Sequence, residues 1–192
     1  MPNAHPALND LYGHSYFDEM LENRISKAMG SFGDRRHKLW NVRHYAKLLP
    51  EATHLPASQR QAWIYYGVFP GAVLTFYPDS CGFYQFLPLG TRRSAMQGCG
   101  FGLPDKRREM RAARYLHRRI DHTTGKEDVQ LIKWSWEGMR SSAFDGFILS
   151  DLESGVWDYH DRLREVLPVL NLAEAPPEGT LARRNQELRD AA

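Results

Sequence analysis

The residue types that could carry chemistry in this chain are eight histidines, two cysteines and a few carboxylates. Their spacing matches no common catalytic pattern, because the sequence holds no H-E-x-x-H zinc motif, no G-x-S-x-G turn and no glycine-rich phosphate loop. Cys81 and Cys99 are too far apart for a C-x-x-C site and too few for a zinc cage. We expect both to be free thiols in the core. His5, followed by Pro6, is the histidine nearest the start.

The acidic pair Glu127-Asp128 stands directly ahead of an apolar run with helical spacing. Carboxylates in the first turn of a helix stabilise its positive end, and residue type alone assigns the pair this role. Six arginines between positions 107 and 119 indicate a solvated helix face, with a site for an anionic partner as the alternative.

The composition is that of an ordinary globular protein. The chain has 192 residues, 42% of them hydrophobic and 25% charged, which is enough for one domain with a buried core. A formal charge of +2 gives no general case for nucleic-acid binding. The sequence shows no apolar run long enough to span a membrane and no secretory signal, so we expect a cytoplasmic protein.

Short aromatic runs interrupted by Pro, Asp and Gly predict an antiparallel sheet between Trp63 and Gly102. Upstream of it, residues 15–29 read as helix-like fragments. Downstream, Met110, Ala113 and Ile120 recur at helical spacing, with Leu116 or His117 between them.

We predict a break at the Thr-Thr-Gly of residues 123–125 and a second, amphipathic helix starting near Glu127. A third helix is expected over 151–167, ended by Pro168. Strands followed by helices indicate an α+β fold. We expect one domain over residues 1–170 and a loose polar tail over 171–192.

Six short motifs occur in an order and spacing that resemble one protein family. They are Phe69-Pro70, Pro78-Asp79, the run Leu87 to Gly90, Glu127-Asp128, the run Glu137 to Ser141, and the run Glu153 to His160. Over residues 1–168 they resemble the catalytic domain of the α subunit of Rieske-type non-haem iron ring-hydroxylating oxygenases.

The resemblance implies a helix-grip domain of the START/Bet v 1 type, in which an antiparallel sheet wraps a long helix. It also implies one mononuclear Fe(II), held in the family by two histidines and one carboxylate. The carboxylate corresponds to Asp128, and the second histidine precedes a proline, as His5 does. The resemblance therefore makes His5 and Asp128 the metal ligands and the catalytic residues. The family's first histidine corresponds to the position before Met1, so we expect a truncated chain with a weak, incomplete iron site.

Family α subunits also carry a Rieske domain, which binds a [2Fe–2S] cluster through C-x-H and C-x-x-H pairs. Cys81 and Cys99 are each followed by Gly-Phe, so we expect that this chain cannot bind the cluster. Electrons from NAD(P)H would then come through a separate Rieske-containing chain and a reductase. The family's trimers make a homo-oligomer an expectation. His14 is a poor substitute for the missing ligand, because positions nine apart lie on different helix faces, and His160 fits a structural role.

Two functions remain open. The first is the C-terminal catalytic part of a ring-hydroxylating or demethylating oxygenase, which uses O₂ on an aromatic or other small organic substrate and is inactive alone. The alternative is a helix-grip protein that carries a hydrophobic ligand without catalysis. Aromatic side chains of the predicted strands are the candidates to line its cavity: Trp63, Tyr65, Phe69, Phe76, Tyr84 and Phe86. Iron content separates the two functions.

Overall fold

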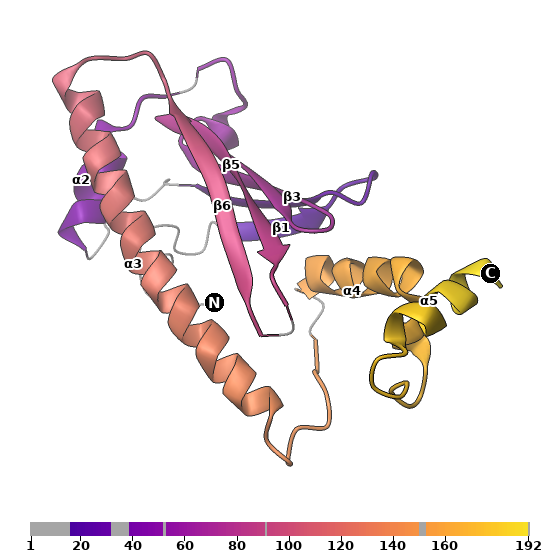
Figure 1. Cartoon of the computed structure of the whole chain (residues 1–192). Helices are drawn as coiled ribbons and strands as arrows, with labels where there is room; N and C mark the ends of the chain where they lie inside the picture. The colour runs from indigo at the N-terminus through magenta and orange to yellow at the C-terminus, as the bar shows by residue number, and fades with distance from the viewer. Residues whose placement is uncertain (1–15, 32–38, 52, 91, 150–152, 192) are drawn as a thin grey trace.

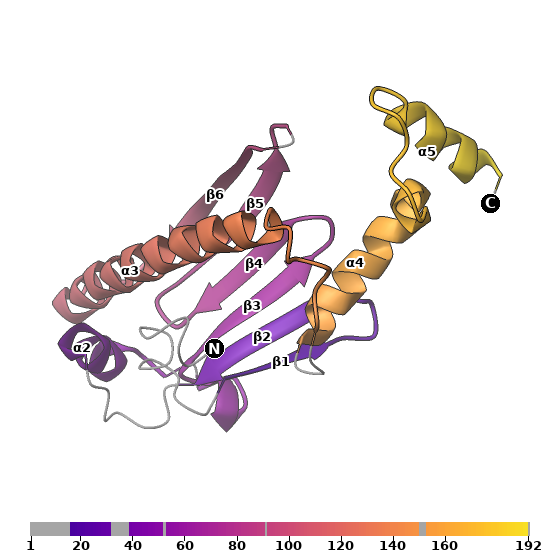
Figure 2. The same ribbon diagram turned by 90° about the horizontal axis from the view of Figure 1, so that it is seen from below.

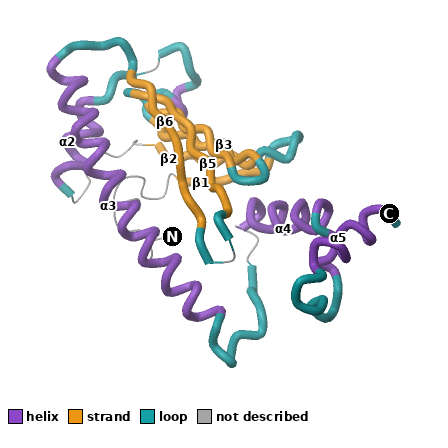
Figure 3. Tube along the Cα trace, in the orientation of Figure 1, coloured by secondary structure: helices purple, strands orange, loops and turns teal. Residues whose placement is uncertain are grey.

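The computed structural model of the chain describes residues 16–31, 39–51, 53–90, 92–149 and 153–191. Its fold is α+β, as predicted, with one antiparallel sheet whose six strands follow chain order (Figure 3). The strands are β1 (Tyr16–Met20), β2 (Ser26–Ser31), β3 (Ala62–Val68), β4 (Ala72–Tyr77), β5 (Ser80–Pro88) and β6 (Ser94–Gly102).

A single long helix, α3, lies across one side of this sheet, with α2 beside its N-terminal half (Figures 1 and 2). Helix α4 lies at the far end of the sheet near β1, and α5 extends beyond it. The helices are α2 (Trp40–Leu48), α3 (Arg108–Met139), α4 (Ser154–Val166) and α5 (Leu181–Asp190), with short 3₁₀ turns η2 (Ala57–Gln59) and η4 (Pro168–Asn171).

The predicted sheet between Trp63 and Gly102 is confirmed, but it is only part of the sheet. The prediction of helix-like fragments over residues 15–29 is wrong for the described residues of this stretch, which form strand β1, a turn and most of β2. Strand β2 pairs with β3 along its whole length, and Met29 is buried opposite Ile64. Pairing with a neighbouring strand has outweighed the local helical preference.

Helix α3 is continuous, so the predicted break at residues 123–125 is wrong. The Thr123 hydroxyl donates to the carbonyl of Arg119, four residues earlier, which satisfies the hydroxyl within the helix. Gly125 costs only about 1 kcal/mol relative to alanine inside a helix. As a consequence Glu127 and Asp128 lie in the middle of a helix and not in its first turn.

The main core lies between the first half of α3, helix α2 and strand β3. The inward-facing residues predicted for the first half of α3 are all buried, Leu116 and His117 both included. They pack against Val42, Tyr45 and Ala46 of α2 and against Trp63, which is 1% exposed. No residue of α3 after Ile120 is buried, so the second half of the helix covers the sheet without a tight core.

Strand pleating divides the aromatic residues of the sheet between its two faces. In β3 and β4, Trp63, Tyr65 and Tyr77 share the α3 side, whereas Tyr66 and Phe76 lie on the other. The rings of that second pair contact each other, with centroids 5.9 Å apart.

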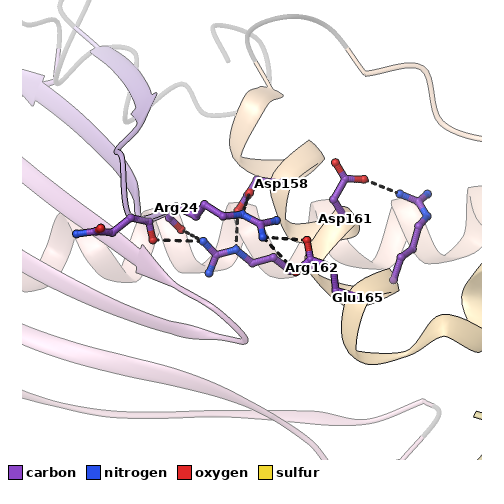
Figure 4. A network of polar contacts seen from close by, with 7 residues as sticks. Arg24, Asp158, Asp161, Arg162 and Glu165 are labelled. Atoms are coloured by element: carbon purple, nitrogen blue, oxygen red, sulfur yellow. Dashed lines mark hydrogen bonds and ion pairs between the residues drawn. The ribbon is translucent and has the colours of Figure 1, made fainter. Parts of the chain in front are cut away.

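A network of charged side chains joins α4 to the β1–β2 hairpin (Figure 4). Arg24 has a positive φ of 55° and donates from Nε to Asp158 Oδ1 at 2.6 Å. It also bonds Glu165, while Arg162 pairs with Asp158 at 2.9 Å and donates to the Arg24 carbonyl. The helix predicted over 151–167 is confirmed as α4 within the described residues.

The prediction of a loose C-terminal tail is wrong for residues 181–190, which form α5. Asn185 is 8% exposed, and its side-chain oxygen accepts a hydrogen bond from the Val169 amide of η4. Since this buried contact ties α5 to η4, the helix has tertiary support that its polar composition did not suggest.

Among the described residues, no helix has the length and apolar character needed to cross a membrane.

Candidate functional site

A cavity of about 950 Å³ lies between the sheet and helix α3. Its sheet wall is largely aromatic, with Trp63, Tyr65, Tyr84 and Phe86 on the sheet face that α3 covers. Phe86 is 47% and Met96 66% exposed, so this wall is accessible from solvent. A volume of this size falls in the range of small-molecule sites, about 300–1,000 Å³.

The opposite wall is polar and comes from one face of α3. Residues 114, 117, 118, 121, 124, 125 and 128 all line the cavity, at the three- and four-residue spacing that aligns side chains along a helix. Among them are His117, Asp121, Thr124 and Asp128. The cavity therefore presents an apolar surface on one side and hydrogen-bonding groups on the other.

A buried hydrogen-bonded chain runs from the core to the polar wall. Trp63 Nε1 donates to the Tyr45 hydroxyl at 2.7 Å, and that hydroxyl donates to Asp79 Oδ1 at 2.9 Å. Asp79, which is 0% exposed, bonds His117 Nδ1 through Oδ2 at 2.9 Å. His117 Nε2 then lies 3.4 Å from Asp121 Oδ2 in the cavity. The chain joins α2, β3, the β4–β5 turn and α3.

The surroundings of His117 favour its charged form. Burial disfavours the imidazolium, but the hydrogen bond that Nδ1 donates to Asp79 and the charges of Asp121 and Asp79 outweigh it, so the pKa of His117 is raised. The rings of Trp63 and Tyr77 lie 4.7 Å and 4.6 Å from the imidazole. Their faces and edges enclose the ring and hold its orientation.

Two neighbouring groups have shifted pKa values as well. Burial raises the pKa of the Tyr77 hydroxyl above its ordinary value, so this phenol stays neutral. The pKa of Asp121 is raised above its ordinary value by loss of water and by the charge of Asp79, while the charge of His117 opposes the shift. The Asp121 side chain is 54% exposed and lies 3.4 Å from the His117 imidazole, and both water and this cation favour its ionised form.

Of the two predicted iron ligands, the structure describes one. Asp128 lies on the cavity side of α3 and is exposed. His5, and also His14, lie outside the described residues. Within the described ranges, no three His, Cys, Asp or Glu side chains are grouped to hold a metal ion. The described part thus offers one carboxylate donor of suitable chemistry and does not by itself form an iron site.

The cysteines are free, as predicted, but neither is in the core. Cys81 and Cys99 are exposed because the register of β4, β5 and β6 places both on the same sheet face as Phe76, away from α3. Four of the six predicted aromatic candidates line this cavity. Phe76 lies on the other sheet face, and Phe69 instead contacts Tyr159 of α4, with ring centroids 5.5 Å apart.

No site role was predicted for Asp79 or Asp121. Pro78-Asp79 was noted as a strand-ending motif of the family, and only the burial of Asp79 reveals its pair with His117. A polar residue on the apolar side of a helix, as His117 is, was the one available signal that a buried partner exists.

Comparison with known proteins agrees with this fold. Residues 1–168 match the family described as "Ring hydroxylating alpha subunit (catalytic domain)". The fold resembles the crystal structure of the quaternary ammonium Rieske monooxygenase CntA in complex with inhibitor MMV12, at 13% identity and a TM-score of 0.55. It also resembles a quaternary ammonium Rieske monooxygenase studied for carnitine oxidation by gut microbiota, at 12% identity and a TM-score of 0.56.

Each structural match covers 85% of this chain but only 41% and 42% of the matched chains, so the chain spans less than half of their length. At such low identity the likeness shows the fold alone. No curated protein matches the chain. The match over residues 1–168 covers most of the sequence, and the chain belongs to the ring-hydroxylating α subunit catalytic domain family.

Proposed function

We propose that this chain provides the mononuclear-iron half of a Rieske-type oxygenase, with Asp128 and His5 as two of its iron ligands. The reaction would be the O₂-dependent oxidation, by hydroxylation or demethylation, of an aromatic or other small organic substrate. The observation that carries the proposal is the position of Asp128, the family's expected carboxylate, on the wall of the cavity.

The two walls of the cavity would have different roles in the reaction. Iron, when bound, would supply the site at which O₂ is activated. The aromatic sheet wall would hold the apolar body of the substrate and keep water from it. The helix wall would orient the substrate through its polar groups.

The proposal needs partners for electron supply. A Rieske-containing chain and an NAD(P)H-dependent reductase would deliver electrons, and a homo-oligomer such as the family's trimer would bring chains together. A cytoplasmic location would give access to NAD(P)H. These partners are expectations from the family.

The proposal is tested by anaerobic titration of Fe(II) into four proteins: the parent chain, Asp128→Ala, His5→Ala and Asp145→Ala. Asp145 lies in a loop away from the cavity and is the matched control. We expect weak binding by the parent, a clear loss in both ligand variants, and parent affinity in the control. Equal Fe(II) binding by the parent and Asp128→Ala would remove the iron-site assignment.

The second candidate function is a carrier of hydrophobic ligands without catalysis. It is supported by the large, largely aromatic cavity, together with the lack of a metal-binding group among the described residues. A carrier would bind apolar ligands and show no specific Fe(II) binding in the same titration.

A further inference from the structure

Three α3 residues that line the cavity each have a buried polar atom without a hydrogen-bond partner in the described part of the chain: Arg114 Nε, His117 Nε2 and Thr124 Oγ1. The Arg114 guanidinium bonds the carbonyls of Asp105 and Leu103 through its other nitrogens, whereas His117 Nε2 and Thr124 Oγ1 lie two helical turns apart along the wall. His117 is 6% exposed and lines the cavity. Buried polar atoms are nearly always satisfied, so an unsatisfied pair on a cavity wall indicates a water or ligand that completes it.

The neighbours of His117 fix what its free nitrogen can offer. Nδ1 already bonds Asp79, whose carboxylate also accepts from Tyr45. These contacts hold the imidazole with Nδ1 as donor and turn Nε2 toward Asp121, 3.4 Å away and outside hydrogen-bonding geometry. A charged imidazole presents an N–H at this point, beside a carboxylate acceptor.

Only some ligand groups fit between such a donor and such an acceptor. A carboxylate could accept from His117 but would face the negative Asp121. An ammonium group could donate to Asp121 but would face the N–H of His117. A hydroxyl group can do both at once, because its oxygen accepts one hydrogen bond and donates another.

We propose that the cavity binds a hydroxylated aromatic ligand, whose hydroxyl group bridges His117 and Asp121 while its rings lie on the sheet wall. Trp63, Tyr65 and Tyr84 supply the aromatic surface opposite this polar pair. This inference deepens the proposed function, because it names the class of substrate that the same cavity would take. Calling the ligand a substrate rests on the proposed function, whereas its binding does not. The Thr124 hydroxyl, farther along the wall, offers a second polar contact to a larger ligand.

The test is equilibrium dialysis of the metal-free chain against 2-naphthol, naphthalene and 2-naphthoate. We expect 2-naphthol to bind about tenfold or more tightly than naphthalene, since an apolar ligand leaves the polar pair unmatched. We expect 2-naphthoate to bind more weakly than 2-naphthol. Equal affinity for 2-naphthol and naphthalene, or preference for the carboxylate, would overturn the proposal.

Variants then assign the effect to the pair. His117→Gln removes the bridge but also unpairs buried Asp79, so the decisive variant is Asp121→Ala, whose side chain is exposed. It should bring 2-naphthol down to the affinity of naphthalene and leave naphthalene unchanged. Glu109→Ala, an exposed acid on α3 that does not line the cavity, should bind both ligands like the parent. If Asp121→Ala lowers the affinities for 2-naphthol and naphthalene by the same factor, the bridge is contradicted.

The result is independent of iron. Asp128→Ala should keep the preference for 2-naphthol even where it loses Fe(II), so a failed iron site and a failed hydroxyl site give different outcomes. If Asp128→Ala removes the preference for 2-naphthol, the hydroxyl group is bound elsewhere on the wall and the bridge is wrong.

Discussion

At the scale of single residues, the pair of Asp79 and His117 is the feature with the clearest energetic consequence. Asp79 is fully buried and holds two hydrogen bonds, one from Tyr45 and one from His117. A buried carboxylate is costly unless it is paired, so the protonated imidazole stabilises the folded chain.

The stability of the fold should therefore depend on pH through His117. The pKa of His117 is raised in the folded state above its ordinary value of about 6.5. Its contribution to stability is complete below that value and is lost as the pH rises through the raised pKa. We predict that the NMR titration of the His117 ring gives a pKa above that of free histidine, and that Tm falls over the same pH range.

His117 is surrounded by titratable or charged groups from three parts of the fold. They are Tyr45 of α2, Tyr77 and Asp79 of β4 and the turn after it, and Arg118 and Asp121 of α3 itself. A His117 pKa at or below that of free histidine would show that burial outweighs the two carboxylates.

Sequence reasoning could find some of these residues and not others. Asp128 was found because a family motif marks it. His117 was found only as an inward position of a helix. Asp79 and Asp121 were missed, because burial and closeness in space, rather than local pattern, make them important.

At the scale of elements, the two halves of α3 have different roles. The first half packs against α2 and β3 and supplies most of the helix wall of the cavity. The second half carries exposed and half-buried residues, and Asp128 is its last residue to line the cavity. Helical periodicity predicted the inward residues of the first half correctly. It could not predict that the helix continues through residues 123–125, because glycine and threonine lower helix propensity only slightly.

Gly125→Ala should stabilise α3. The backbone there is helical, and an added Cβ would have no atom within 4 Å. Replacing a helical glycine by alanine stabilises by about 0.5–1 kcal/mol. Urea unfolding should show this gain in the free energy of unfolding.

Gly98→Ala in β6 is the contrasting variant. Its Cβ would lie 2.3 Å from the carbonyl oxygen of Phe83, so it should destabilise the sheet. A neutral or harmful Gly125→Ala would mean that residues 123–125 are not held in a regular helix in solution.

Helix α4 should depend on its ionic contacts with the β1–β2 hairpin. Asp158 accepts from Arg24 and pairs with Arg162, and its side chain is only 19% exposed. Asp158→Asn should therefore speed amide hydrogen exchange in α4 by a few-fold and leave β3 and β4 unchanged. Added salt should also speed amide hydrogen exchange in α4 of the parent, because salt screens these ionic contacts.

Asp161→Asn serves as the matched control, since Asp161 pairs only with Arg164 of its own helix among the described contacts. It should exchange like the parent. Equal exchange in Asp158→Asn and Asp161→Asn would show that the network contributes nothing to the docking of α4.

At the scale of the whole molecule, much apolar surface is left exposed on the second half of α3. Val129 is 53% and Ile132 64% exposed. The sequence pattern predicted an amphipathic helix here, but among the described residues nothing buries its apolar face. The fold class and the main sheet could be predicted from pattern, whereas the two N-terminal strands depend on pairing that a linear pattern does not reveal.

We predict weak, concentration-dependent self-association of the chain through this surface. Sedimentation velocity should show larger species as concentration rises, and Ile132→Glu should reduce them. Leu181→Glu, at an exposed position on α5, should not. A clean monomer at high concentration would count against this surface.

The central claim is that Asp128 is an iron ligand on this fold. The most direct measurement adds a histidine ahead of Met1, where the family pattern has its first ligand, and titrates Fe(II) anaerobically. The account predicts that this chain binds Fe(II) orders of magnitude more tightly than the parent, and that Asp128→Ala in the extended chain abolishes the gain. An extension that leaves affinity unchanged, or a gain that survives Asp128→Ala, would contradict it.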